Sequence, residues 1–391
     1  MKARIVASVL LAAAVAIPAM ASSQEGPVKV GVIFPQSGGA GPQGRHVIQA
    51  IQAMAEILNE QGGVLGRQIE LISRDDESTP AIGVSRANEL ISEGVEVFIE
   101  GWNSPVTLAM QPVIDRADIM DITVFSSADG ILSGEGNALA VRLNSSNAQN
   151  GVVTANYIAE NGWTRVAFLT ENDAYGNGAQ QAIEDAFAEM DYEYQKVAEE
   201  KFPFEQSDFR VQLSNVKAAN PDVTVAISAN EGLGMPALIR QAKRSRLPGQ
   251  LVAAVGTVAP SVIDVAGDTA DGLVGADIYF PNVEPFASNE ANQRFVAKVE
   301  GEFDYTPDKY MALGAVALQI WSQAVSDVGS FEKGAVGERI RGGSFENTIL
   351  GDITFEDNGQ MISNHFTFSV SGQTIVVDDG DETPGESSSA K

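Results

Sequence analysis

The chain has 391 residues, 44% of them hydrophobic, and carries 52 acidic against 25 basic side chains, a net charge of −27 at pH 7. This length suits two domains, and so acidic a surface argues against nucleic acid and anionic membranes as partners because both would repel it. The lack of cysteine excludes disulfides and thiolate-bound metals, and with only two histidines, His46 and His365, we expect neither a His-based triad nor a His-rich metal centre.

The first 21 residues have the pattern of a secretory signal peptide. Lys2 and Arg4 precede an apolar run at 5–17, and Ala19-Met20-Ala21 supplies the small residues of a cleavage site. The run is too short to cross a bilayer, which takes about 20 residues. We therefore expect cleavage after Ala21 and an exported protein that resides in the periplasm without inserting into the membrane.

Strands and helices then alternate along the chain. Apolar β-rich runs separated by helical patterns predict strands at 28–34, 69–74, 95–100 and 121–126 and helices at 44–60, 80–92 and 105–116. Because parallel strands are connected through crossover helices, these elements predict one parallel sheet.

A second series of the same kind follows. It predicts strands at 165–170, 194–201, 223–228 and 251–256 and helices at 147–160, 176–190, 207–218 and 232–245. The C-terminal third adds a strand at 272–280, helices at 288–301 and 309–328, and short strands near 353, 366 and 375. Too little remains there for a third domain, so we expect the late elements to complete the two lobes.

The predicted fold is α/β, with two doubly wound parallel-sheet lobes and several crossings between them. Lobe 1 takes residues 27–146 and 277–350, lobe 2 takes 147–276 and 351–377, and 378–391 form a disordered acidic tail. Two such sheets form a cleft, and a ligand binds there at the carboxyl ends of the strands.

The segment Gly39–Gly44 fits the dinucleotide pattern G-x-G-x-x-G between a strand and a helix. The pattern also needs an acid at the end of the next strand about 20 residues on. Asp75 lies 31 residues after Gly44. We therefore expect no cofactor, and glycines that let a loop and a helix N-terminus approach a ligand.

Polar residues follow two neighbouring strands of the first lobe. Trp102-Asn103-Ser104-Pro105 follows the strand at 95–100, with Ser104 placed as the N-cap of the next helix, and Phe125-Ser126-Ser127 ends the strand at 121–126. Hydroxyls at two adjacent strand ends can converge on one carboxylate or amide. Capping alone explains Ser104 equally well, and turn chemistry explains the other serines.

In the second lobe, Tyr175 and Glu231 follow strands and face the cleft. Glu231 can oppose a ligand ammonium, although most carboxylates of so acidic a chain are simply solvated. No activated nucleophile or acid–base pair accompanies these residues. We therefore predict a binding protein and not an enzyme.

This order of turns resembles the type I periplasmic solute-binding proteins of ABC transporters, specifically the branched-chain amino acid receptors. The resemblance runs from about Val28 to Val377 and rests on a set of short motifs taken together: Ser37-Gly38 with Gly44, Arg74-Asp75-Asp76, Ser104, Tyr175-Gly176 and Ile239-Arg240-Gln241-Ala242. It implies three hinge crossings and closure over a small solute. The solute is then presented to the membrane subunits of an ABC permease by a monomeric receptor.

The resemblance also assigns ligand-binding roles. Ser104 and Ser127 match residues that bind the ligand carboxylate, and Tyr175 matches an aromatic residue of the other lobe. Further wall positions of the family fall on Gln43, Trp102, Asn103, Phe125 and Ser126. One departure stands out: the acid that neutralises the ligand ammonium in the family falls at Gly256 here, and Glu231 takes the place of an aromatic wall residue.

This departure leaves the ligand open. Either Glu231 has taken over the ammonium, and the ligand is by default an aliphatic amino acid, or the ligand is an amine-free carboxylate such as an aromatic acid, or a small amide or urea-like compound. A periplasmic sensor is the alternative to a transport receptor.

Overall fold

The computed structural model describes residues 26–133, 139–377 and 383–384. The expected signal peptide, 1–21, lies outside the described residues, as does most of the expected disordered tail, 378–391. Two tail residues, Thr383–Pro384, form a short strand, β15, antiparallel to β13 (Asn364–Ser371). The expectation of disorder is therefore wrong for these two residues.

The first lobe is built on a parallel sheet of five strands in the order β2-β1-β3-β4-β5. Its strands are β1 (Val28–Phe34), β2 (Ile69–Asp75), β3 (Val97–Glu100), β4 (Met120–Thr123) and β5 (Ala140–Arg142). The connecting helices are α1 (Gly41–Glu60), α2 (Pro80–Glu93) and α3 (Ser104–Arg116). The sequence predicted the first four strands and all three helices, but not the three-residue β5.

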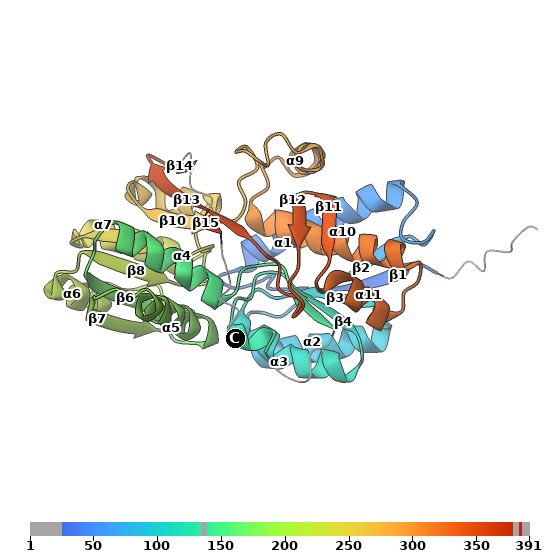
Figure 1. Cartoon of the computed structure of the whole chain (residues 1–391), viewed down its shortest axis with the longest axis horizontal. Helices are drawn as coiled ribbons and strands as arrows, with labels where there is room; N and C mark the ends of the chain where they lie inside the picture. The colour runs from blue at the N-terminus through green and yellow to red at the C-terminus, as the bar shows by residue number, and fades with distance from the viewer. Residues whose placement is uncertain (1–25, 134–138, 378–382, 385–391) are drawn as a thin grey trace, which may run out of the picture.

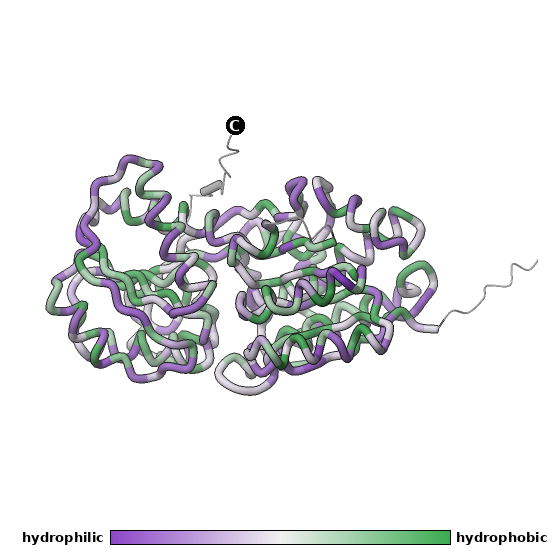
Figure 2. The backbone as a smooth tube through the Cα atoms, turned by 90° about the horizontal axis from the view of Figure 1, so that it is seen from below, coloured by the Kyte–Doolittle hydropathy of each residue, from purple (hydrophilic) through white to green (hydrophobic). Residues whose placement is uncertain are grey.

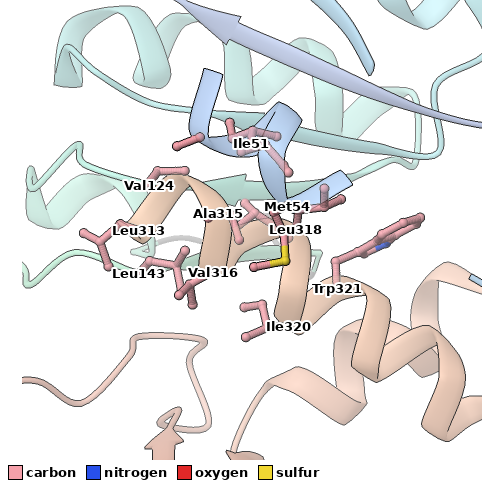
Figure 3. Packing of buried hydrophobic residues seen from close by; sticks show 14 of the residues in the cluster. Ile51, Met54, Val124, Leu143, Leu313, Ala315, Val316, Leu318, Ile320 and Trp321 are labelled. Carbon is pink, nitrogen blue, oxygen red and sulfur yellow. The ribbon is translucent and has the colours of Figure 1, made fainter. Parts of the chain in front are cut away.

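Helices cover both faces of this sheet, which explains why β1 is an apolar run. In β1, Val30 and Val32 belong to the cluster formed with α1 and α10 (Lys309–Val328), whereas Ile33 packs with α2 and α3 on the opposite face. Figure 3 shows apolar side chains of α1, such as Met54, lying against those of α10, such as Leu318. A strand buried on both faces has no polar side to alternate with.

The second lobe has a sheet in the order β14-β13-β10-β9-β8-β6-β7, with β15 paired to β13. Strands β6 to β10 are parallel, and β13 and β14 add antiparallel strands at one edge. The strands are β6 (Arg165–Glu171), β7 (Gln195–Phe202), β8 (Val223–Ile227), β9 (Gln250–Ala253), β10 (Val274–Asp277) and β14 (Thr374–Val377).

One face of this sheet packs on α4 and α5, the other on α6, α7 and α8. These helices are α4 (Asn147–Glu160), α5 (Ala174–Glu189), α6 (Arg210–Ala219), α7 (Gly234–Ser245) and α8 (Pro260–Ala266). Helix α4 begins as predicted because Ser146 and Gln149 form a reciprocal capping box, in which each side chain bonds the other's backbone N–H.

The chain crosses between the lobes three times: from β5 to α4, from β10 to α9 (Glu290–Phe303), and into β13 (Figure 1). Seen from below, the two lobes form separate bodies side by side (Figure 2). The predicted fold class, two α/β lobes joined by three crossings, is confirmed.

The last crossing comes later than expected. We placed 351–377 in lobe 2, but β12 (Gly351–Thr354) pairs with β11 (Ser344–Thr348), and Ile353, Phe355 and Met361 pack in the core of the first lobe. Only β13 and β14 of this segment join the second sheet. β12 is the strand predicted near 353, but its partner β11 and helix α11 (Lys333–Ile340) were not predicted. Nowhere in the described residues is there a helix both long and apolar enough to span a bilayer.

Candidate functional site

A cavity of about 30 Å³ lies between the lobes, at the carboxyl ends of strands from both sheets. Six of the nine predicted site residues line it, together with seven others: Trp102, Ser104, Phe125, Ser127, Asn144, Tyr175, Ala229, Glu231, Val255, Gly256, Thr257, Lys309 and Tyr310. Since one water needs roughly 10–15 Å³, the cavity has room for about two waters. The lobes are therefore closed, and an organic ligand needs them to separate before it can enter.

Ser104 differs from its predicted capping role. Helix α3 begins at Ser104 itself, and Asn103 is the N-cap residue, whose carbonyl accepts from the N–H groups of Val106 and Thr107. The Ser104 hydroxyl makes no capping bond. Its Oγ accepts from the N–H of Ala128 at 3.2 Å. The cavity thus receives a hydroxyl whose proton remains available to an acceptor.

Ser127 and Asn144 form the second polar pair of the first lobe. The Asn144 Nδ2 donates to the Phe125 carbonyl at 2.8 Å and to the Ser127 Oγ at 2.9 Å. The Ser127 hydroxyl in turn donates to the Phe125 carbonyl at 3.2 Å. These bonds orient both side chains at the cavity wall beside Ser104, so that hydroxyl and amide donors from two strand ends meet there.

Three aromatic rings form the apolar wall. Measured between ring centres, Tyr310 lies 4.8 Å from Trp102 and 5.1 Å from Phe125, and Trp102 lies 5.3 Å from Phe125. The Trp102 indole N–H donates to the carbonyl of Ala229 in the second lobe at 3.4 Å. Trp102 is therefore both a wall of the cavity and a contact between the lobes.

Glu231 reaches the cavity from the loop after β8, and its side chain is buried. The hydroxyl of Tyr310 contacts its Oε1, while its Oε2 has no hydrogen-bond partner among the described residues. Burial raises the pKa of Glu231 to about 8, although the nearby Lys309 cation acts in the opposite direction.

Lys309, at the start of α10, brings a buried cation to the cavity. Its Nζ donates to the Gly256 carbonyl at 2.8 Å, lies 3.5 Å from the Asp277 carboxylate, and sits 4.3 Å from the centre of the Tyr310 ring. Gly256 has φ +76°, and a Cβ there would come within 2.6 Å of Lys309 Nζ. Glycine therefore provides both the backbone conformation and the space for the cation.

Three predicted residues do not line the cavity. Gln43 donates to the Ser261 Oγ of the second lobe at 3.5 Å. Ser126 bonds the Thr107 hydroxyl at 2.9 Å, on the side of the buried Glu100. Asn103 serves as the N-cap described above.

The glycine-rich loop of the first lobe touches the second lobe. A Cβ at Gly232 would lie 1.8 Å from the Gly39 carbonyl, and one at Gly39 would lie 2.6 Å from the Asn230 side chain. Helix α1 begins at Gly41, so the last residues of the G-x-G-x-x-G segment are already helical. The glycines allow the lobes to approach closely. Among the described residues, no group of three or more His, Asp or Glu could hold a metal ion.

Sequence reasoning missed Asn144, Lys309 and Tyr310. Asn144 follows β5, which was not predicted. The polar run Asn144-Ser145-Ser146-Asn147 is the feature of the sequence that could have indicated a site residue there. Lys309 and Tyr310 open a helix that was predicted, but α10 belongs to the first lobe while its N-terminus touches the second. Nothing local in the sequence reports that contact.

Two α/β lobes that close over a polar cavity at their strand ends define a receptor for a small solute. The chain belongs to the periplasmic binding protein family, whose model matches residues 27–374. Members of this family bind solutes without chemically converting them, which agrees with the prediction of a binding protein and not an enzyme.

Similar proteins include receptors for different solutes. The Leu/Ile/Val-binding protein homolog 1 of Brucella abortus is 24% identical over 350 residues, 88% of this chain and 90% of that protein. The leucine-binding protein LivK of Thermotoga maritima superposes with a TM-score of 0.80 at 25% identity, covering 90% of this chain and 97% of that one. A solute-binding protein of R. palustris in complex with benzoate superposes with a TM-score of 0.83 at 23% identity, covering 92% of this chain and 97% of that one.

Proposed function

We propose that this protein captures a small organic carboxylate in the periplasm and delivers it to the membrane subunits of an ABC permease. The observation that carries the proposal is the convergence of Ser104, Ser127 and Asn144 at one wall of a closed cavity between the lobes. Hydroxyl and amide donors suit a carboxylate because they solvate its charge when water is excluded. The Ser104 proton has no acceptor among the described residues, and Ser127 and Asn144 would exchange their bonds to the Phe125 carbonyl for bonds to the ligand.

The signal peptide expected at 1–21 supports a periplasmic location, and the relatives named for amino acids and for ABC transport support the role of a transport receptor, which we propose acts as a monomer. By default the solute is an aliphatic amino acid, whose ammonium would face the unpartnered Oε2 of Glu231. The second candidate is an amine-free carboxylate. It is favoured by the Lys309 ammonium, which already occupies the Gly256 turn.

Calorimetric titration tests the carboxylate. The protein is unfolded, dialysed and refolded to remove any bound solute, then titrated with amino acids, hydroxy acids, aromatic acids and the matching primary amides. We expect saturable binding of at least one carboxylate, and much weaker binding of its amide. Binding of amides alone would contradict the proposal.

A further inference from the structure

The second-lobe side of the cavity has a fixed cation. Lys309 Nζ is held by the Gly256 carbonyl and the Asp277 carboxylate, and its side chain is 3% exposed. Asp277 is thereby engaged by a cation of the protein itself. A ligand ammonium directed at the Gly256 turn would meet a like charge within a small, buried cavity, which is strongly unfavourable.

The remaining carboxyl group of the cavity, Glu231, is buried, and its Oε1 contacts the hydroxyl of Tyr310. The same hydroxyl lies 2.5 Å from the Gly256 carbonyl, which also accepts from Lys309. A phenol has one proton, so Tyr310 donates either to Glu231 or to Gly256. When it donates to Gly256, the contact with Glu231 needs a proton from the carboxyl group, and a neutral Glu231 then satisfies both contacts.

The surroundings of Glu231 agree with this proton count. The charged or titratable groups that act on it are Lys309 and Tyr310 at the start of α10, Asp308 before them, Asp277 at the end of β10 and Tyr175 across the cavity. Burial is the largest effect and opposes the ionised form of Glu231, as do the two aspartates, whereas Lys309 and a hydrogen bond from Tyr310 favour it. The net effect is the raised pKa of about 8 given above, so Glu231 is mostly neutral at pH 7.

We infer that Lys309 and Glu231 are specificity-determining residues that make the site prefer an amine-free carboxylate, such as a 2-hydroxy acid, over the amino acid of the same shape. This rests on the proposed carboxylate function. The ligand carboxylate binds the first-lobe donors, and a neutral hydroxyl donates to Oε2 of Glu231, which has no other partner among the described residues. An ammonium in the same place finds no free anion to balance its charge.

Matched ligand pairs that differ only in hydroxyl against ammonium test the inference. Calorimetry at pH 7 would compare lactate with alanine, 2-hydroxy-4-methylpentanoate with leucine, and mandelate with phenylglycine. In the pair that fits the site best, we expect the hydroxy acid to bind at least tenfold more tightly. Tighter binding of the amino acid would overturn the inference and leave the carboxylate function standing. If no member of any pair binds, the inference fails, whereas the carboxylate function fails only if none of the acids in the wider panel above binds.

Proton release tests the protonation state of Glu231 in the native protein. Measured by titrating in phosphate and in Tris at pH 7, it should be near zero on hydroxy acid binding. Glutamine has the shape of the neutral acid, so Glu231→Gln should weaken the hydroxy acid less than Glu231→Ala does. Release of about one proton, or an equal loss of affinity in the two variants, would overturn the inference.

Lys309→Met removes the fixed cation. We expect it to shift the ratio of affinities at least fivefold towards the amino acid, because Asp277 then becomes available to an ammonium. An unchanged ratio in a variant whose circular dichroism matches the native protein would overturn the role of Lys309. Because the buried Asp277 charge is left unpaired and can compromise folding, Lys309→Met combined with Asp277→Asn, which removes both charges, is the control and should shift the ratio less than Lys309→Met alone.

Discussion

Replacing Ser104 with alanine tests the carboxylate wall of the site. The Ser104 hydroxyl accepts from Ala128 N–H, and its own proton has no acceptor among the described residues, so it is free to bind a ligand oxygen. A hydrogen bond to a charged group contributes about 1.5–3 kcal/mol. At about 1.4 kcal/mol per tenfold change, the dissociation constant of the carboxylate should rise roughly 10- to 150-fold.

The same substitution leaves the Ala128 N–H without its acceptor. Burial of an unpaired donor costs about 1–3 kcal/mol, so the unliganded variant should also unfold at lower urea concentration. Binding and stability must therefore be measured separately, by calorimetry on the folded protein and by urea unfolding without ligand.

Ser126→Ala is the matched control, since Ser126 bonds Thr107 and does not line the cavity. It should lower stability while leaving the dissociation constant within about threefold of the native value, a change of roughly 0.6 kcal/mol. Equal affinity in the Ser104→Ala and native proteins would refute the role of Ser104. An equal loss in both variants would refute the placement of the carboxylate at this wall.

Three further predictions concern closure, pocket size and pH. Gly232→Ala places a Cβ 1.8 Å from the Gly39 carbonyl, so the lobes should fail to close. In small-angle scattering, the radius of gyration of the variant should then be the same with and without ligand. A decrease on ligand binding as large as that of the native protein would contradict this. Trp102→Ala removes one aromatic wall of the cavity and should lower the free energy of unfolding in urea by about 3–5 kcal/mol. In calorimetry, the variant should prefer bulkier acids than the native protein does. An unchanged preference would show that the indole does not limit the size of the pocket. Buried acids hold their protons in the folded state at pH values where the unfolded chain has lost them, so the free energy of unfolding should fall as pH rises from about 6.5 to 9. Glu171→Gln removes one of these acids and should make this fall less steep. An equally steep fall in the variant and the native protein would contradict the raised pKa of Glu171. Burial raises the pKa to about 7 for Asp76 and Asp121, 8 for Glu231 and 9 for Glu171, which sets this pH range.

The sequence predicted the long elements of the fold because their burial is visible locally. β1 is an unbroken apolar run, and the structure covers both of its faces with helices. The missed elements are short: β5 has three residues, α8 seven and α11 eight. Elements of this length contain too few residues to show a period, and they form because neighbouring strands and helices stabilise them.

The boundary near residue 351 was wrong for a related reason. The segment that contains β12 has the alternating pattern of a strand, and such a pattern predicts a strand without telling which sheet it joins. Here β12 pairs with β11 in a separate two-stranded sheet, and Ile353 packs into the first lobe. Sheet membership depends on contacts between distant segments, which a single sequence does not report.

The same distinction separates the predicted site residues from the missed ones. Ser104 and Ser127 follow neighbouring predicted strands of one sheet, whose carboxyl ends lie at the same edge, and Glu231 follows a predicted strand of the other sheet. Because the carboxyl ends of strands from both sheets face the cavity, local patterns were enough to bring the three together. Lys309 reaches the cavity from the N-terminus of a helix that covers the first lobe, and its partner Gly256 lies 53 residues away in the second. The loss of an acid at Gly256 was visible in the sequence, but the cation that occupies the space was not. The missing acid at Gly256 therefore says little about the ligand until the group that fills its space is known. Here that group is the Lys309 ammonium, whose charge is opposite to that of the missing acid.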